Sequence, residues 1–221
     1  MSRDLVIFGT GDIAQLALHY FSSDSQYTVR GFAVDSAYLK EEVFAGLPVV
    51  PFEDVTRHFE PARFDCFIAL SYSGLNSLRM ERYLQARELG YRMASYVSSR
   101  ASVLTDEPIG DNCFILEDNT IQPFVRIGNN VTLWSGNHIG HHSVIHDHCF
   151  LASHIVVSGG VEIGERCFIG VNATLRDHIR IGERCVIGAA AVMLADAEAE
   201  GVYMASATER SRVPSTRLRK L

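Results

Sequence analysis

IGNNVTLWSGNHIGHHSVIHDHCFLASHIVVSGGVEIGERCFIG, residues 127–170, has an aliphatic residue at every sixth position. The register continues in both directions without an insertion, and glycine often follows the aliphatic residue, as tight turns require. Its sixteen members are Val103, Ile109, Ile115, Ile121, Ile127, Leu133, Ile139, Ile145, Leu151, Val157, Ile163, Ile169, Leu175, Ile181, Ile187 and Met193. Such hexads are typical of a parallel β-helix, in which three short strands and three turns make one coil. The length of the repeat, residues 103–192, therefore predicts about five coils.

Cysteines occupy one column of this repeat. Cys113, Cys149, Cys167 and Cys185 each stand two residues before a periodic aliphatic residue. We expect side chains in that column to point into the narrow interior, because a free cysteine behaves as a small hydrophobe. The five cysteines form no CxxC pair, so the sequence indicates neither a zinc ribbon nor a disulfide framework.

Residues 1–98 follow a different pattern, in which short apolar runs alternate with helical segments. Strands are expected at 5–9, 27–34, 47–50, 65–70 and 92–97, and helices over 13–21 and 73–90, the second with Ser73 as its N-cap. Such alternation predicts a parallel sheet covered by helices. The predicted fold is therefore an α/β domain with a short, Rossmann-like half sheet over 1–98, a β-helix domain over 99–194 and a basic tail over 195–221.

The composition is that of an ordinary globular protein, 47% hydrophobic and 21% charged. The net charge of −6 argues against nucleic acid as a partner, because proteins neutralise phosphates with a basic face. The apolar run before Gly9 is too short for a signal peptide or a membrane span. We therefore expect a cytoplasmic protein without a membrane span.

A glycine-rich turn follows the first expected strand. Gly9, Thr10, Gly11 and Asp12 open a G-x-G-x-x-[GA] pattern between a strand and a helix, where a helix N-terminus can bind phosphate. Asp35, at the end of the next expected strand, is placed to reach a ribose hydroxyl or a base. The pattern also fits a purely structural strand–helix turn. Because the domain has room for only one nucleotide-binding half, NAD is not expected.

An α/β domain followed by such hexads resembles the left-handed β-helix sugar acyltransferases, the hexapeptide-repeat family with bacterial amino-sugar N-acetyltransferases and sialic acid O-acetyltransferases. The resemblance implies a left-handed helix, acetyl-CoA as acyl donor, no metal, and a homotrimer with active sites between subunits. It also implies that the N-terminal domain binds a nucleotide-linked sugar for a surface polysaccharide or glycan, with Ser71 and Tyr72 at the sheet edge. The sequence does not separate an amine from a hydroxyl acceptor, and we expect the amine.

The family's catalytic histidine follows a periodic aliphatic residue at the second position, which in the motif IGHH is His141. A histidine suits proton removal at neutral pH. His142 stands where the family has an acid; Asp147 or an acid of a neighbouring subunit are alternatives for orienting the base. Position 159 stacks one coil from 141, so the Gly159 N–H is expected to bind the oxyanion. The resemblance places acetyl-CoA along Gly159, Gly160, Asn172, Ala173, Ala189 and Ala190.

The histidines of IGHHSVIHDHC, residues 139–149, also suggest a zinc site. His141 and His146 match two ligands of the γ-class carbonic anhydrases, which share the hexad fold. The third ligand of that family would fall at Thr105, and a zinc enzyme needs three protein ligands, so this alternative is the weaker one. We expect His148 in a solvated turn, whereas His146 and His154 are candidates for contact with substrate.

Overall fold

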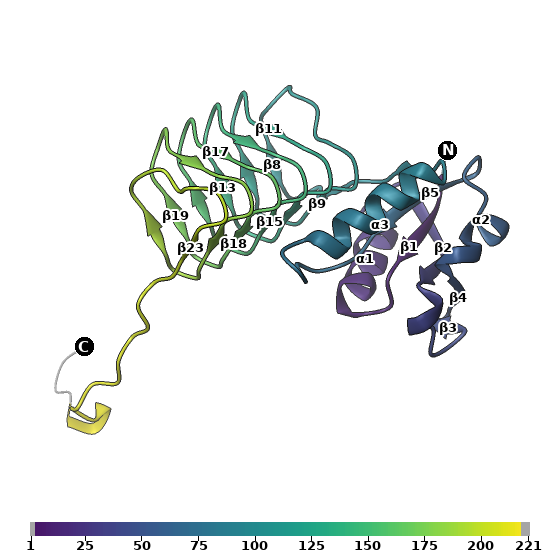
Figure 1. The fold of residues 1–221 in the computed structure, drawn as a ribbon, viewed down its shortest axis with the longest axis horizontal. Helices are drawn as coiled ribbons and strands as arrows, with labels where there is room; N and C mark the ends of the chain where they lie inside the picture. Colours follow the sequence, from purple (N-terminus) through teal and green to yellow (C-terminus); the bar gives the residue numbers. More distant parts are fainter. Residues whose placement is uncertain (1–2, 218–221) are drawn as a thin grey trace.

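The computed structural model describes residues 3–217, which form an N-terminal α/β domain, a β-helix and an extended tail (Figure 1). The N-terminal sheet has the strand order β3-β4-β2-β1-β5-β6 and is parallel except for β3. Alternate residues of β1 face opposite sides, as in any strand. Leu5 and Ile7 pack with α1, whereas Val6 and Phe8 pack with α2 and α3.

The elements of this domain are β1 (Arg3–Phe8), α1 (Asp12–Ser23), β2 (Tyr27–Val34), β3 (Val43–Phe44), β4 (Leu47–Pro51), α2 (Val55–His58), β5 (Phe64–Ile68), α3 (Ser77–Glu88) and β6 (Arg92–Met93). Short 3-10 turns span Ser36–Tyr38 and Phe52–Asp54. The second predicted helix begins later than the sequence indicated, at Ser77 instead of after Ser73. Leu75 and Asn76 have positive φ angles of 52° and 64°, which an α-helix cannot contain.

The β-helix has three parallel sheets, each named here as a face after one of its strands. The β13 face contains β8 (Ser102–Val103), β10 (Thr120–Ile121), β13 (His138–Ile139), β16 (Val156–Val157), β19 (Thr174–Leu175) and β22 (Val192–Met193). The β14 face contains β11 (Arg126–Ile127), β14 (Val144–Ile145), β17 (Glu162–Ile163) and β20 (Arg180–Ile181). The β15 face contains β7 (Tyr96–Val97), β9 (Phe114–Ile115), β12 (Thr132–Leu133), β15 (Phe150–Leu151), β18 (Phe168–Ile169), β21 (Val186–Ile187) and β23 (Val202–Tyr203).

The hexad residues and the cysteine column form one continuous core inside the β-helix. Cys113, Cys149, Cys167 and Cys185 are fully buried, as predicted, and burial raises the pKa of the Cys113 thiol to about 12. Val103 differs from the other hexad residues, because 36% of it is exposed. It lies in β8, the last strand of its sheet, so no further coil covers it.

The chain changes from one sheet to the other inside the single strand expected at 92–97. Arg92–Met93 pairs with β5 of the N-terminal sheet, whereas Tyr96–Val97 pairs with β9 of the β-helix. Val202–Tyr203, in the expected tail, still pairs with β21. The predicted domain limits at 98 and 194 therefore stay predictions, and residues 218–221 of the tail lie outside the described residues.

Helix α3 joins the two domains by packing on turns at the edge of the β15 face. The buried guanidinium of Arg79 donates hydrogen bonds to Thr132 Oγ1 at 2.5 Å and to the carbonyl oxygens of His148 and Cys149, each at 3.1 Å. The expectation of a solvated His148 is wrong, because this contact buries its turn. Burial lowers the pKa of His148 to about 4.

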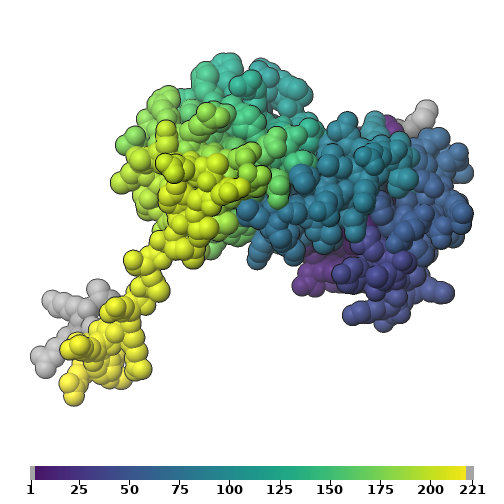
Figure 2. Space-filling model, in the orientation of Figure 1, coloured from purple at the N-terminus to yellow at the C-terminus, as the bar shows by residue number. Residues whose placement is uncertain are grey.

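Residues 205–217 of the tail extend away from the β-helix and are exposed throughout (Figure 2). Within residues 3–217, no helix is both long enough and apolar enough to cross a membrane.

Candidate active site

His141 lies at the corner between β13 and β14, with its imidazole against Gly159 of the next coil. A Cβ atom on residue 159 would lie 2.6 Å from Cε1 and 2.8 Å from Nε2 of His141. A Cβ atom on Gly140 would lie 2.6 Å from the backbone nitrogen of Gly159. Within residues 3–217, the Gly159 N–H donates a hydrogen bond to no protein atom. The two glycines therefore leave an imidazole and a free backbone donor side by side.

The group that faces His141 is His142. The two Nδ1 atoms lie 3.1 Å apart, and the His141 N–H donates to Gln122 Oε1 at 2.8 Å. The ring of Phe124, from the preceding coil, lies 4.6 Å from the His142 ring between centroids. Asp147 does not orient the base within this chain, because its carboxylate accepts the Asn129 N–H at 2.7 Å on another turn. No described residue hydrogen-bonds to Nε2 of His141, which leaves that atom available to a ligand.

The residues expected along acetyl-CoA fall into two groups. Gly160, Asn172 and Ala190 lie at turns with positive φ angles of 69°, 58° and 58°, and Asn172 and Ala190 are exposed together with Ala189. Ala173 is fully buried in the core of the β-helix, so its side chain faces away from any surface groove.

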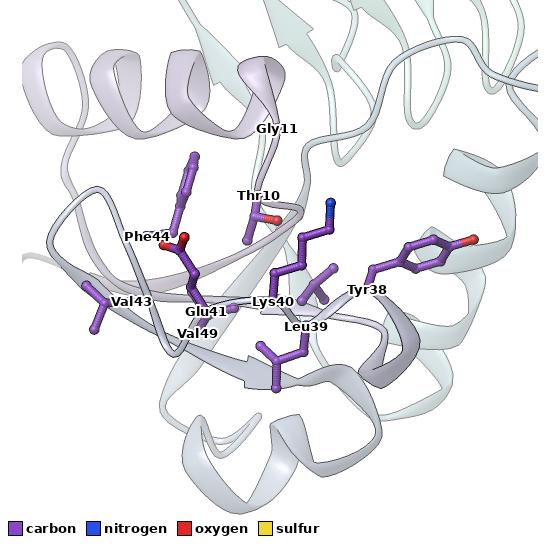
Figure 3. Close-up of a pocket in the computed structure, with 10 residues that line it drawn as sticks. Thr10, Gly11, Tyr38, Leu39, Lys40, Glu41, Val43, Phe44 and Val49 are labelled. Carbon is purple, nitrogen blue, oxygen red and sulfur yellow. The ribbon is translucent and has the colours of Figure 1, made fainter.

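A cavity of about 460 Å³ opens beside the glycine-rich turn of the N-terminal domain. Thr10 and Gly11 line one side, and the segment after β2 supplies Tyr38, Lys40 and Phe44 (Figure 3). The exposed Lys40 ammonium extends toward Thr10 (Figure 3). A helix N-terminus and a cation, both of which can bind a phosphate group, therefore border the same cavity.

The other predicted substrate residues differ in their surroundings. Gly9 has a φ of 116°, and a Cβ there would lie 2.9 Å from the Ala69 carbonyl oxygen, so the turn requires glycine for structural reasons. Asp12 is exposed in the first turn of α1. Asp35 does not line the cavity, because its carboxylate accepts a hydrogen bond from Arg82 Nη2 at 2.8 Å.

Ser71 and Tyr72 line a separate cavity of about 370 Å³ between the two domains. Its opposite wall is aromatic: the Tyr72 ring lies 5.0 Å from the ring of Phe150 and 4.6 Å from that of Phe168 between centroids. Ala189 borders the same cavity. Two predicted substrate contacts, Ser71 and Tyr72, and one predicted acetyl-CoA contact, Ala189, therefore meet here.

His146 and His154 lie on different turns of the β-helix. Nε2 of His146 lies 3.0 Å from Glu162 Oε1 on the β14 face, and this contact lowers the pKa of the Glu162 carboxyl. The ring of His154 packs over Gly136 on another turn. No group of three histidine, cysteine, aspartate or glutamate residues in 3–217 is arranged to hold a metal ion.

Sequence reasoning missed Lys40 and the aromatic wall of the second cavity. Lys40 is one of only two lysines in the chain, and it follows the strand that ends at Val34. These two features together could have indicated it as a site residue. Phe150 and Phe168 each precede a hexad residue, but nothing local shows that the N-terminal domain covers that column.

Three stretches of the β-helix, residues 109–141, 142–177 and 160–195, match the model of the bacterial transferase hexapeptide family, which has six repeats. Residues 109–195 therefore carry the hexapeptide repeat that this family model describes. The match confirms the hexad register as a transferase-type repeat. No curated protein matches the chain.

The hexapeptide domain and the α/β domain together resemble several solved structures. The acetyltransferase domain of PglB from Neisseria gonorrhoeae, in complex with acetyl coenzyme A, is 20% identical with a TM-score of 0.82, over 93% of this chain and 97% of that chain. PerB from Caulobacter crescentus, in complex with CoA and GDP-perosamine, is 23% identical with a TM-score of 0.81, over 91% and 94%. WeeI from Acinetobacter baumannii is 19% identical with a TM-score of 0.76, over 91% and 96%. The predicted fold, an α/β domain followed by a left-handed parallel β-helix, is confirmed.

Proposed function

We propose that the protein is an acetyl-CoA-dependent N-acetyltransferase that acts on the amino group of a nucleotide-linked sugar. The contact between His141 and Gly159 carries this proposal. Nε2 of His141 removes a proton from the attacking amine, and the unpaired Gly159 N–H stabilises the oxyanion that forms on the thioester carbonyl. The amine nitrogen bonds to the carbonyl carbon, the C–S bond breaks, and the CoA thiolate takes up the proton from His141.

The acyl donor and the acceptor are supported by the two solved relatives with ligands. One is in complex with acetyl coenzyme A, and the other with CoA and GDP-perosamine. The perosamine N-acetyltransferase has also been solved with a histidine replaced by asparagine. We propose that Gly159, Gly160, Asn172, Ala189 and Ala190 border acetyl-CoA in this chain, mainly through backbone atoms and small side chains.

The cavity beside Gly11 is the proposed nucleotide site. The amide groups at the start of α1 and the ammonium of Lys40 suit a diphosphate, and Tyr38 and Phe44 offer apolar surface to a base. Asp35 has no direct part in this site, because Arg82 pairs with its carboxylate. Ser71 and Tyr72 lie at the inner cavity, where the sugar would pass from the nucleotide site toward the β-helix.

The two parts of the site lie on different sides of one chain, which supports a homotrimer with active sites between subunits. The hydrogen bonds and ring contacts between the domains, such as those of Arg79 and Tyr72, lie on the β15 face or on turns at its edges. His141 lies at the opposite corner, between the β13 and β14 faces. We therefore propose that a nucleotide-linked sugar bound to one subunit meets His141 of its neighbour.

A hydroxyl acceptor is the second candidate, because the same base and oxyanion donor serve O-acetylation. Acetyl-CoA and nucleotide-linked sugars are made in the cytoplasm, so we propose that the enzyme works there, in the synthesis of a surface polysaccharide or glycan. The deciding experiment measures CoA release from acetyl-CoA with matched pairs of nucleotide-linked sugars that carry either an amino or a hydroxyl group.

We expect CoA release with an amino sugar and at least about a 100-fold slower rate for His141→Gln, the usual scale for a general base. His58→Asn, which replaces an exposed histidine of α2, is the matched control and should keep the wild-type rate. Release only with hydroxy sugars would select O-acetylation. Absence of release with every acceptor would reject the proposed donor, and wild-type turnover in His141→Gln would reject the base.

A further inference from the structure

The resembling family has an acidic residue after its catalytic histidine. In this chain, His141 faces the imidazole of His142 instead. Nδ1 of His141 and Nδ1 of His142 are 3.1 Å apart, which is hydrogen-bonding distance. Two neutral imidazoles in this arrangement share one proton, so one ring donates and the other accepts. If His141 donates, its Nε2 keeps the lone pair of a base. If His142 donates, the proton of His141 sits on Nε2 and the base is lost.

The neighbouring groups do not determine which of the two rings donates the shared proton. Gln122 Oε1 accepts the backbone N–H of His141, and Phe124 packs on the His142 ring without a polar atom. Gly159 contacts the His141 ring from the next coil. Within residues 3–217, no carboxylate oxygen lies within 4.0 Å of a ring nitrogen of His141 or His142.

One further titratable group belongs to the same edge of the β-helix. His178 packs over Gly160, one coil beyond His142, and its Nε2 lies 4.0 Å from Asp177 Oδ2. This ion pair is separated from the His142 ring by the Gly160 turn.

We propose that His142 is a positioning residue that accepts the Nδ1 proton of His141 and thereby keeps the lone pair of the base on Nε2. This inference rests on the proposed function of His141. It has a consequence that an acid in place of His142 would not have. One proton added to the pair abolishes the base wherever it binds, because protonated His142 has no lone pair for His141 and protonated His141 has none for the substrate. Turnover therefore requires two neutral imidazoles.

The variant His142→Asn separates positioning from titration. The asparagine Oδ1 can accept the same Nδ1 proton but does not titrate, and asparagine tolerates the positive φ of 60° at this turn. We expect kcat at pH 8 within about threefold of wild type. At pH 5 we expect a higher kcat in the variant than in wild type, because the wild-type pair offers a proton two imidazoles to bind and the variant offers one. Comparing the two enzymes at each pH cancels the ionisation of the amino acceptor.

The variant His142→Asp restores an acid to this position. Its carboxylate stabilises the imidazolium that forms as His141 takes up the proton, so we expect kcat at pH 7 about tenfold above that of His142→Asn. His58→Asn is the control for the loss of an exposed histidine and should keep the wild-type pH profile. An equal fall in kcat between pH 8 and pH 5 in wild type and His142→Asn would overturn the inference, as would a loss of activity in His142→Asn at every pH with an unchanged melting temperature.

Nitrogen-15 NMR of the histidine side chains tests the pair without turnover. We expect the His141 proton on Nδ1 at pH 8, and two coupled protonation steps in wild type against one step in His142→Asn. A His141 proton on Nε2 at pH 8 would overturn the positioning role even in an active enzyme. Inactivity of the wild type toward all acceptors would instead reject the proposed function, while the NMR result would still decide the geometry of the pair.

Discussion

The ring of His141 occupies the space that a side chain on residue 159 would fill, because a Cβ atom there would approach its Cε1 to 2.6 Å. The approach is closer than real Cβ contacts allow, so either the ring or the coil must shift if Gly159 is replaced. Such a shift moves the proposed base and the proposed oxyanion donor at the same time. Even a single methyl group added at residue 159 is therefore expected to have a large effect on catalysis.

Gly159→Ala should therefore lower kcat by at least about 100-fold, the range measured when an oxyanion donor or a base is displaced. The reason is displacement of the exposed His141 ring, not loss of core packing, so we expect a change of only a few degrees in melting temperature. Steady-state kinetics and circular dichroism melting measure the two effects separately. Wild-type kcat in a folded Gly159→Ala protein would contradict the proposed geometry.

Lys40→Gln should raise KM for the nucleotide-linked sugar by about tenfold, since a hydrogen bond to a charged group contributes about 1.5–3 kcal/mol. KM for acetyl-CoA should stay unchanged, because Lys40 lines only the cavity beside Gly11. The control is Arg57→Gln, which removes an equally exposed cation from α2. An equal rise in both KM values, or no rise in either, would exclude Lys40 from the nucleotide site.

Arg79→Met should lower the free energy of unfolding by about 2–6 kcal/mol, because two buried acceptors lose their donor at about 1–3 kcal/mol each. The substitution leaves Asn76 Oδ1 and the carbonyl oxygen of His148 without their donor, whereas the carbonyl oxygen of Cys149 still accepts the Thr132 N–H. Urea denaturation measures the change. Arg57→Met, at an exposed ion pair, should change stability by less than about 0.5 kcal/mol. Equal midpoints for the two variants would show that Arg79 does not hold the domains together.

The pKa of His148, lowered by burial to about 4, predicts a loss of stability in mild acid. The unfolded chain binds this proton near its ordinary pKa of about 6.5, and the folded chain only near 4, so protonation favours unfolding between these values. The expected loss between pH 6.5 and pH 4 is about 2 kcal/mol, and it levels off below pH 4.

His148→Asn should remove this loss. Asparagine already occupies the same turn in neighbouring coils, at Asn112 and Asn130, with positive φ angles of 51° and 54°. Urea denaturation of both proteins at pH 7 and pH 4.5 isolates the contribution of His148 from that of the carboxyl groups. An identical pH dependence in the two proteins would show that His148 is protonated without cost in the folded state.

Much of the architecture was predictable because the hexad signal is local. Each hexad residue from Ile115 to Ile187 is buried in the β-helix core, since a side chain that faces inward in one coil does so in every coil. The same spacing correctly brought residue 159 beside residue 141. The roles assigned to His141 and Gly159 stay predictions until the kinetic experiments are done.

The sequence by itself determined the β-helix, its register and the adjacency of His141 and Gly159, because a repeat of period six sets which side chains stack. Only the tertiary structure decided that α3 buries His148, that Arg82 pairs with Asp35 and that Lys40 borders the cavity beside Gly11. These contacts join residues far apart in the chain, such as Arg79 and His148. Their formation depends on which face of the β-helix the N-terminal domain covers, and no periodicity within either domain encodes that choice.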